Sequence, residues 1–235
     1  MPRTSSRRIH WVVGIDLSGP ANPQGTCGAV FKLHGHELVF TRMITPASDK
    51  AIMDMVVELA GQFTVGIDAP LSYEDGGKQR KRDKLLRELL KRQGVQHVGV
   101  MAPTFNRMVY LTLRGMGLAR QIEMCRQAEG CNIVEVHPGS ALALRGADPD
   151  WLAGYKPRGA GSPGRAARQR RLRCCAALGV FLGSQCVVDL PINSLRVDHE
   201  VDACAAAVAC RDWLLGKPLW REPRSPPQHP YDFVC

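Results

Sequence analysis

Two short apolar runs that each end in an aspartate, Val13-Gly14-Ile15-Asp16 and Val65-Gly66-Ile67-Asp68, decide the fold of this chain. Apolar runs of this length that are bounded by turn residues are typical of buried strands. An aspartate at the end of a buried strand stands on a rigid support where solvent and ligands can reach it. Paired carboxylates are the oxygen ligands that a hard divalent cation prefers. Asp16 and Asp68 are therefore the first candidates for a metal site.

Strands and helices are predicted to alternate around these runs, which indicates an α/β fold. Strands are expected over residues 11–16, 27–33, 37–42, 63–68 and 131–136, and helices over 49–61, 78–93, 104–128, 140–145, 165–179 and 197–215. The span 146–164 is rich in Gly and Pro and is expected to be a loop. Such a loop could be a lid, a homodimer contact or simple disorder. The expected division is a basic N-terminal extension (1–10), a single domain (11–216) and a Pro-rich tail (217–235) outside the core.

Composition narrows the class of protein. Of the 235 residues, 45% are hydrophobic, which is ample for a core, and no apolar run approaches the roughly 18 residues of a membrane helix. The nine cysteines are scattered and form no Cys-x-x-Cys pair, which argues against a zinc site and indicates reduced thiols. We therefore expect a cytoplasmic protein without a membrane partner.

The distribution of charge favours a polyanionic partner. The net charge is +9, and two segments carry about half of all Lys and Arg. Lys78–Arg92 holds eight cations and two acids, whereas Lys156–Arg173 holds seven cations and no acid. Either segment alone could be no more than a solvated helix face. Together, beside candidate carboxylates, they favour a channel for a nucleic-acid backbone, with phosphate contacts from Arg82, Arg165 and Arg168.

The helix expected near the C-terminus begins with acids and continues with small residues. Asp198 and Asp202 are four residues apart, so both project from the same face of a helix. Acids in a first turn complement the helix dipole, and this explanation suits Asp198. It suits Asp202 less, because a carboxylate that enters the small-residue stretch 203–209 needs a partner or a metal. Both are candidate metal ligands.

Glu135, near the end of the expected strand 131–136, is a further acid that could either bind a metal or have only a structural role. Alternation along the strand places it opposite two valines, so it need not lie at the surface. A salt bridge to one of the arginines is one explanation, but its place at the same sheet edge as Asp16 and Asp68 favours a role at the metal. His137 follows directly and could shuttle a proton, contact a phosphate or only form a turn.

The order of three strands, a helix, a strand, helices, a strand and a helix resembles the ribonuclease H-like fold. That fold is a mixed five-stranded sheet, three antiparallel strands and then parallel strands, flanked by helices. The resemblance implies metal-binding acids from the first strand, the fourth strand and the last helix, where this chain has Asp16, Asp68 and Asp202. The last of these begins a stretch that is similar to the Asp-Ala-Leu-Ala motif of RuvC-type Holliday-junction resolvases.

Motifs that occur in order over about 190 residues resemble a family of predicted nucleases of this fold, catalogued as a domain of unknown function. They are Gly14-Ile15-Asp16-Leu17-Ser18 with Asn22, Ile67-Asp68-Ala69-Pro70-Leu71-Ser72, Arg114-Gly115, Glu135-Val136-His137-Pro138, Tyr155-Lys156 and the Asp202 helix. The resemblance implies an acid set and a group of substrate contacts. The acid set is Asp16, Asp68, Glu135 and Asp202, and the contacts are Ser18, Asn22, Arg114, His137 and the phosphate-facing Lys156.

Such an acid set implies a nuclease that acts on DNA or RNA with two metal ions. Two Mg²⁺ or Mn²⁺ ions about 4 Å apart would share Asp16, and Asp68 and Asp202 would complete the two sites. One ion would lower the pKa of a water to make a nucleophile, and the other would stabilise the leaving 3′ oxygen. Carboxylates crowded in this way repel, so without cations at least one should hold a proton or move away.

Two other classes of protein are also compatible with the sequence. The phrase Gly14-x-Asp16-x-Ser18-Gly19 also resembles the phosphate-binding loop of actin-like ATPases and sugar kinases, although those proteins repeat the fold in two domains and are far longer. A non-catalytic nucleic-acid-binding or partner-binding module of the same fold is the other. Few exposed-looking aromatic residues accompany the basic segments, so stacking of unpaired bases is not expected.

Overall fold

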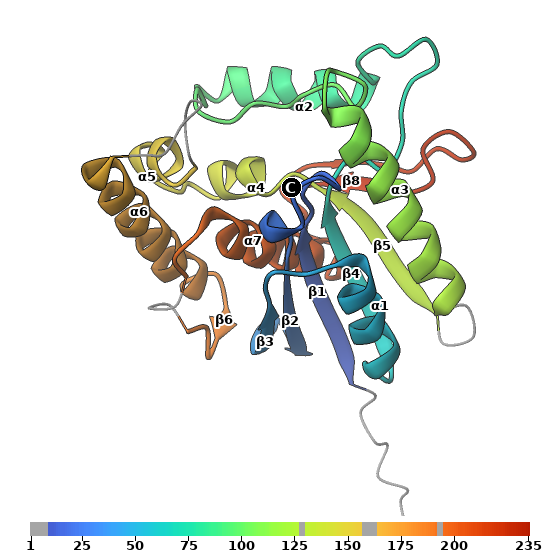
Figure 1. The fold of residues 1–235 in the computed structure, drawn as a ribbon, viewed down its shortest axis with the longest axis horizontal. Coiled ribbons are helices and arrows are strands. Elements are labelled where there is room, and N and C mark those ends of the chain that lie inside the picture. The colour runs from blue at the N-terminus through green and yellow to red at the C-terminus, as the bar shows by residue number, and fades with distance from the viewer. Residues whose placement is uncertain (1–8, 127–129, 157–163, 192–194) are drawn as a thin grey trace, which may run out of the picture.

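A mixed β-sheet forms the centre of the fold, and helices cover both of its faces (Figure 1). The computed structural model describes residues 9–126, 130–156, 164–191 and 195–235. Within them the sheet has eight strands in the order β6-β3-β2-β1-β4-β5-β8-β7. The predicted α/β class with a mixed sheet is confirmed. The predicted number of five strands is wrong, because three short strands extend the two edges of the sheet.

The five longest strands are those predicted from the apolar runs. They are β1 (His10–Asp16), β2 (Cys27–His34), β3 (Glu37–Ile44), β4 (Gln62–Asp68) and β5 (Cys131–Val136). β1, β2 and β3 form an antiparallel meander, β4 is parallel to β1, and β5 is parallel to β4. The carboxyl ends of β1, β4 and β5 therefore meet at one edge of the sheet, which is where residues from distant parts of the chain come together.

Two helices cover one face of the sheet. They are α1 (Asp49–Glu58) and α3 (Met108–Cys125). The hydroxyl of Ser48 caps α1, as the sequence predicts, by accepting a hydrogen bond from the backbone N–H of Ala51. Gly115 allows α3 to approach the sheet closely, since a Cβ atom there would lie 2.8 Å from the Cβ of Ala69. The last residues of the predicted helix 104–128, 127 and 128, lie outside the described residues.

Helix α7 (Asp198–Leu214) crosses the other face, and α4 (Pro138–Leu144) and α6 (Arg165–Gly183) pack against it. The other helices are α2 (Lys81–Arg92) and α5 (Pro149–Gly154), with a short 3-10 turn at Pro23–Gly25. Most of α7 is buried, because its residues from 203 to 207 are Ala and Cys. Helix α5 lies within the span 146–164 that the sequence predicts to be a loop, and residues 157–163 of that span lie outside the described residues.

The C-terminal segment belongs to the core, which corrects the prediction of an extended tail outside it. β8 (Asp232–Val234) is parallel to β5, and β7 (Arg221–Glu222) is antiparallel to β8. Phe233, Val234 and Cys235 are buried. At the opposite edge β6 (Val187–Val188) pairs with β3. Strands of two or three residues are too short for the alternation that identifies a strand in a sequence. Most of the predicted N-terminal extension, residues 1–8, lies outside the described residues.

No helix among the described residues is both long enough and apolar enough to cross a bilayer.

Candidate metal centre

Asp16 and Asp68 are the last residues of two neighbouring parallel strands. β1 and β4 pair so that Gly14 lies beside Gly66 and Asp16 lies beside Asp68. Because side chains alternate along a strand, both aspartates project on the same face of the sheet as the two glycines. The two similar phrases of the sequence therefore form one pair of carboxylates at the carboxyl edge of the sheet.

The two glycines allow α7 to pack directly on this face. A Cβ atom at Gly14 would lie 1.9 Å from the carbonyl oxygen of Ala203, and one at Gly66 would lie 2.9 Å from that of Ala206. Since no side chain fits at either position, the helix backbone rests on the strands. Asp202 immediately precedes Ala203, so the same packing brings its carboxylate to the end of β1.

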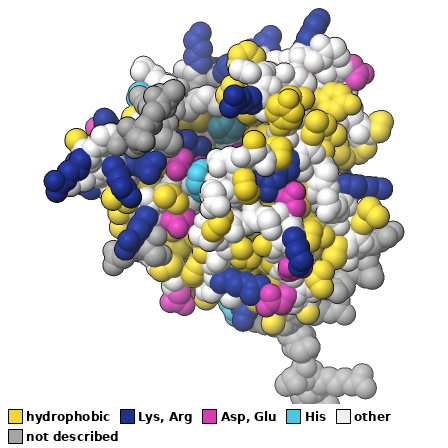
Figure 2. Space-filling view, viewed as in Figure 1, with side chains coloured by type: hydrophobic (Ala, Val, Ile, Leu, Met, Phe, Trp, Pro, Cys, Tyr) yellow, Lys and Arg dark blue, Asp and Glu magenta, His cyan; other side chains and the backbone are white. Residues whose placement is uncertain are grey.

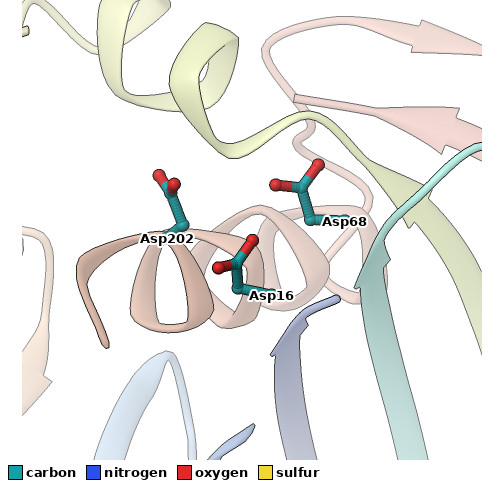
Figure 3. A group of neighbouring side chains, drawn as sticks. All are labelled: Asp16, Asp68 and Asp202. Carbon is teal, nitrogen blue, oxygen red and sulfur yellow. The ribbon is translucent and has the colours of Figure 1, made fainter. Parts of the chain in front are cut away.

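Asp202 completes a group of three carboxylates (Figure 3). One carboxylate oxygen from each of Asp16, Asp68 and Asp202 lies within 4.8 Å of the other two. Asp16 and Asp202 are buried, with 8% and 2% of their surface exposed, and Asp68 is half-buried. Figure 3 shows that the three side chains, from β1, β4 and α7, point into a common space. The structure therefore brings together three of the four acids in the predicted set.

Burial and mutual repulsion make it costly to ionise all three acids. Burial raises the pKa of Asp16, against the opposing effect of a hydrogen bond to His199. The pKa of Asp68 lies well above its ordinary value, first because of burial and then because of the Asp16 carboxylate beside it. A cation placed among the three would relieve both effects. The group therefore favours a bound positive charge.

Three polar side chains contact these acids. The Nζ atom of Lys156 lies 2.7 Å from Oδ2 of Asp202, and the hydroxyl of Tyr155 donates to Oδ1 of Asp202 at 3.0 Å. Nδ1 of His199 lies 2.8 Å from Oδ2 of Asp16. Burial disfavours a charge on Lys156, but the carboxylates, led by Asp202, outweigh it and raise the pKa of the ammonium well above its ordinary value. Lys156, whose side chain is 48% exposed, therefore remains a positive charge at the edge of the acid group.

A cavity of about 340 Å³ opens beside the acids. This volume lies within the range of small-molecule pockets, roughly 300–1,000 Å³. Its wall combines the charged group with apolar side chains from the segment before α3 and from α3 itself. The lining includes Asp16, Asp68, Tyr155, Lys156, Met101, Met108 and Leu111.

Glu135 does not belong to the group of three. It lies beside Ile67 in the register of β4 and β5, so its side chain projects on the face opposite to that of Asp68. Both of its oxygens accept hydrogen bonds from the buried guanidinium of Arg80, one of them at 2.8 Å, and the backbone N–H of Leu71 donates to it at 3.0 Å. The sequence leaves open whether Glu135 forms a salt bridge to an arginine or has a role at the metal. The structure shows the salt bridge, to Arg80.

Asp198 also lies outside the group of three. It is buried in the first turn of α7, one turn before Asp202. The ligand atoms that lie within 4.8 Å of one another come from Asp16, Asp68 and Asp202. The position of Asp198 is the one at which an acid complements the helix dipole.

Ser18, Asn22 and Arg114, predicted to contact substrate, hold the loop that follows β1. The hydroxyl of Ser18 donates to the carbonyl oxygen of Asn22 and lies 2.8 Å from the hydroxyl of Thr26. The Arg114 guanidinium donates to the carbonyl oxygen of Ser18 at 2.6 Å and to Thr26 Oγ1 at 2.8 Å, and it pairs with Asp49 at 2.7 Å. The Ser18 hydroxyl and the Arg114 guanidinium are thus used within the protein, and Asn22 contributes its backbone carbonyl oxygen.

The arginines predicted to contact phosphates fall into two kinds. The guanidinium of Arg82 is buried and donates to the carbonyl oxygens of Tyr231 and Pro223, each at 3.0 Å, so it holds the C-terminal segment in place. Arg165 and Arg168 are exposed in the first turn of α6. Only the second kind faces solvent.

His137 lines the cavity with both ring nitrogens engaged. Its Nδ1 atom accepts a hydrogen bond from the backbone N–H of Ser140, which caps α4, and Nε2 lies 3.2 Å from the carbonyl oxygen of Gly99. Burial lowers the pKa of His137 to about 4, so the ring is neutral at physiological pH. Neither nitrogen is left for a phosphate.

Sequence reasoning missed His199 and named Tyr155 only as part of a motif. His199 lies three residues before Asp202 on the same helix, a spacing that places two side chains on one face. That spacing was the signal available in the sequence. Tyr155 reaches Asp202 from the end of α5, a helix that the sequence does not predict.

A protein-family model matches most of the chain. Residues 14–231 match the family described as "Protein of unknown function (DUF429)". No curated protein matches the sequence. Among solved structures, the chain is similar to the Thermus thermophilus RuvC structure over 88% of its own length and 97% of that chain, with 11% sequence identity and a TM-score of 0.39. The family match spans most of the sequence, and this chain belongs to the DUF429 family.

Proposed function

We propose that this protein is a metal-dependent nuclease of ribonuclease H-like fold that hydrolyses phosphodiester bonds of nucleic acid. The observation that carries the proposal is the meeting of Asp16, Asp68 and Asp202, within 4.8 Å, from two strands in register and a buried helix. Three carboxylates enclosed in this way cost stability unless a cation or a proton compensates them. Acids with raised pKa values beside a cavity are a candidate functional site on physical grounds.

The donor set suits a hard divalent cation. Carboxylate oxygens are the ligands that Mg²⁺ and Mn²⁺ prefer, whereas softer ions favour thiolates and imidazoles. Burial, followed by repulsion from the Asp16 carboxylate, raises the pKa of Asp68, and a bound cation would favour its ionised form. When bound by Asp16, Asp68 and Asp202, one or two such ions would supply Lewis acidity at the phosphodiester and lower the pKa of the attacking water.

The surrounding side chains orient the acids. His199 fixes the carboxylate of Asp16 through Oδ2, and Tyr155 fixes that of Asp202 through Oδ1. Contacts of this kind hold ligands in a productive geometry. Lys156 balances the charge of Asp202 at 2.7 Å. Its ammonium would turn to a substrate phosphate once another cation occupies the acid group.

Helix α6 offers a surface for the nucleic-acid backbone. Arg165 and Arg168 are exposed in its first turn, which contains no acid. Cations at a helix N-terminus oppose the helix dipole, so this placement costs some stability. A bound phosphate would be attracted by the arginines and the dipole alike. Helix α6 packs against α5, and Lys156 lies two residues after the end of α5.

A non-catalytic nucleic-acid-binding module is the second candidate, and the position of Lys156 favours it. An ammonium that already compensates Asp202 could make the group a permanent salt bridge that needs no metal. The ATPase-like alternative has less support, because the hydroxyl of Ser18 is held by Asn22 and Thr26 and Ser18 does not line the carboxylate cavity.

Cleavage assays decide between the two candidates. Labelled single-stranded, duplex and branched DNA and RNA are incubated with Mg²⁺ or Mn²⁺ and with wild type, Asp68→Asn or Asp54→Asn. Asp54 is an exposed acid of α1 paired with Lys50, so Asp54→Asn is the matched control. The proposal expects cleavage by wild type and by the control, and a loss of about a hundredfold or more for Asp68→Asn. Binding of substrate without cleavage under either metal would favour the module.

A further inference from the structure

A second hollow, of about 580 Å³, lies beside the carboxylate cavity and is lined by exposed aromatic side chains. Phe105 precedes α3 and Tyr110 lies in its first turn, and they are 60% and 59% exposed. Figure 2 shows hydrophobic side chains gathered at the upper right of this face, over the region where Figure 1 draws the start of α3. Exposed apolar surface of this kind marks a binding site more often than chance.

The hollow adjoins the carboxylate cavity. Met101, Met108 and Leu111 line both of them. The loop after β1 joins them as well, since Asp16 lines the cavity and residues 19–22 line the hollow. A molecule that lies in the hollow would therefore lie next to the cavity that holds the acids.

Hydrogen bonds hold the segment 103–112, which carries Phe105 and Tyr110, in place. The hydroxyl of Thr112 in α3 donates to the carbonyl oxygen of Pro103 at 2.8 Å, and the hydroxyl of Thr104 donates to that of Gly77 at 2.5 Å. These bonds fix the two residues before Phe105, and the backbone of Phe105 itself bonds to Ala102 and Met108. A ring presented on a braced segment loses little conformational freedom when a ligand stacks on it.

The polar groups of the hollow suit a nucleotide. Arg107 lines it, and none of its lining residues is Asp or Glu. Asn22 and Asn106 add side-chain amides, which both donate and accept hydrogen bonds. Aromatic rings beside a cation, in a groove without acids, are the combination with which proteins hold single-stranded nucleic acid.

We infer that this hollow is a stacking site for unpaired bases of the substrate, with Phe105 and Tyr110 as the stacking rings and Arg107 at the backbone. The inference rests on the proposed function and deepens it by naming the substrate as a single-stranded or locally unpaired nucleic acid. A duplex keeps the faces of its bases covered and gains nothing from the rings. The two basic segments of the sequence do not indicate such stacking, because these aromatics lie outside them.

Fluorescence anisotropy in EDTA measures this binding without cleavage. The probes are a labelled single strand, the same strand with abasic positions, and the duplex of the same sequence. Wild type should bind the intact strand about tenfold or more tightly than the abasic strand, and Phe105→Ala and Tyr110→Ala should each remove about tenfold of that affinity. Binding of the duplex should stay unchanged in both variants.

Two further variants separate stacking from other uses of the hollow. Leu113→Ala changes a residue of α3 that is 58% exposed but does not line the hollow, and it should bind like wild type. Phe105→Leu keeps an apolar side chain without a ring and should bind as weakly as Phe105→Ala.

Equal affinity for intact and abasic strands would overturn the inference, as would wild-type binding by Phe105→Leu. A dimer that dissociates in Phe105→Ala while oligonucleotide binding is unchanged would assign the hollow to a second copy of the chain instead. Failure of the proposed function has a different signature, because wild type would then stack bases in EDTA and still cleave nothing with Mn²⁺.

Discussion

Gly14 of β1 and Ala203 of α7 are in backbone contact: a Cβ atom at Gly14 would lie 1.9 Å from the carbonyl oxygen of Ala203. This contact sets the distance between the helix and the sheet. Since Asp202 precedes Ala203 and Asp16 follows Gly14 by two residues, the same contact determines how close the two carboxylates come. Packing and the candidate metal centre therefore depend on one small residue.

Replacing this glycine should damage stability and the site together. Gly14→Ala forces α7 away from the sheet, and we expect the free energy of unfolding to fall by about 3 kcal/mol, with weaker Mn²⁺ binding. Gly28→Ala in the neighbouring strand β2 is the matched control, because nothing lies within 4 Å of its added Cβ. Urea denaturation and calorimetry check the two effects. Equal stability of the two variants would contradict the close packing.

Glu135→Gln should separate structural support from metal binding. Glu135 and Arg80 form a buried ion pair, and removal of one charge from such a pair costs about 3 kcal/mol or more. Because Glu135 lies outside the acid group, we expect the variant to bind Mn²⁺ as wild type does under conditions where it is folded. Asp68→Asn should show the reverse, with weak binding and little loss of stability. A loss of Mn²⁺ affinity in folded Glu135→Gln would restore Glu135 to the metal.

Lys156→Met should make the protein more dependent on metal. Its ammonium lies 2.7 Å from the buried Asp202, so its removal leaves the acids without their internal cation. The melting temperature in EDTA should fall, and the rise on adding Mn²⁺ should exceed that of wild type. Lys50→Met removes an exposed ion pair on α1 and serves as the control. An identical rise for Lys156→Met and wild type would contradict a role for Lys156 in the acid group.

Asp232 should contribute to stability in a way that depends on pH. Burial disfavours its charge, but hydrogen bonds from the Trp213 side chain and the Arg224 backbone, with the Arg221 side chain, outweigh burial and hold its pKa below the ordinary value. A lowered pKa in the folded state stabilises the protein above the unfolded value of about 4, and this stabilisation is lost as the pH falls through the folded pKa.

Asp232→Asn tests this dependence. The variant should be less stable than wild type at pH 7, and the difference in the free energy of unfolding should shrink below about pH 4. Urea titrations at both pH values measure it. A constant difference across this range would show that Asp232 acts through packing and not through its charge.

The sequence predicts the centre of the fold because long apolar runs carry a strong signal. The strands that end in Asp16 and Asp68 are found within two residues of their predicted bounds. Their meeting with Asp202 was expected from the resemblance of the element order to the ribonuclease H-like fold, and not from the residues alone. The short strands β6, β7 and β8 were not, because two or three residues show no periodicity.

Register and pairing explain the errors at the site. The sequence places Glu135 at the correct sheet edge, but only the pairing with Ile67 reveals that it faces away from Asp68. The arginines were misread for a similar reason: Arg82 and Arg114 bind carbonyl oxygens and a carboxylate contributed by segments far away in the chain. A sequence shows that such residues are charged but not which partner they reach.

Calorimetric titration of Mn²⁺ into wild type and Asp202→Asn, with Asp54→Asn as the control, tests the central claim most directly. The account predicts that wild type and the control bind one or two ions per chain and that Asp202→Asn loses at least tenfold in affinity. It also predicts that Asp202→Asn remains folded, because the amide keeps the shape of the side chain. Wild-type affinity in Asp202→Asn, or no Mn²⁺ binding by wild type, would contradict a metal centre built from Asp16, Asp68 and Asp202.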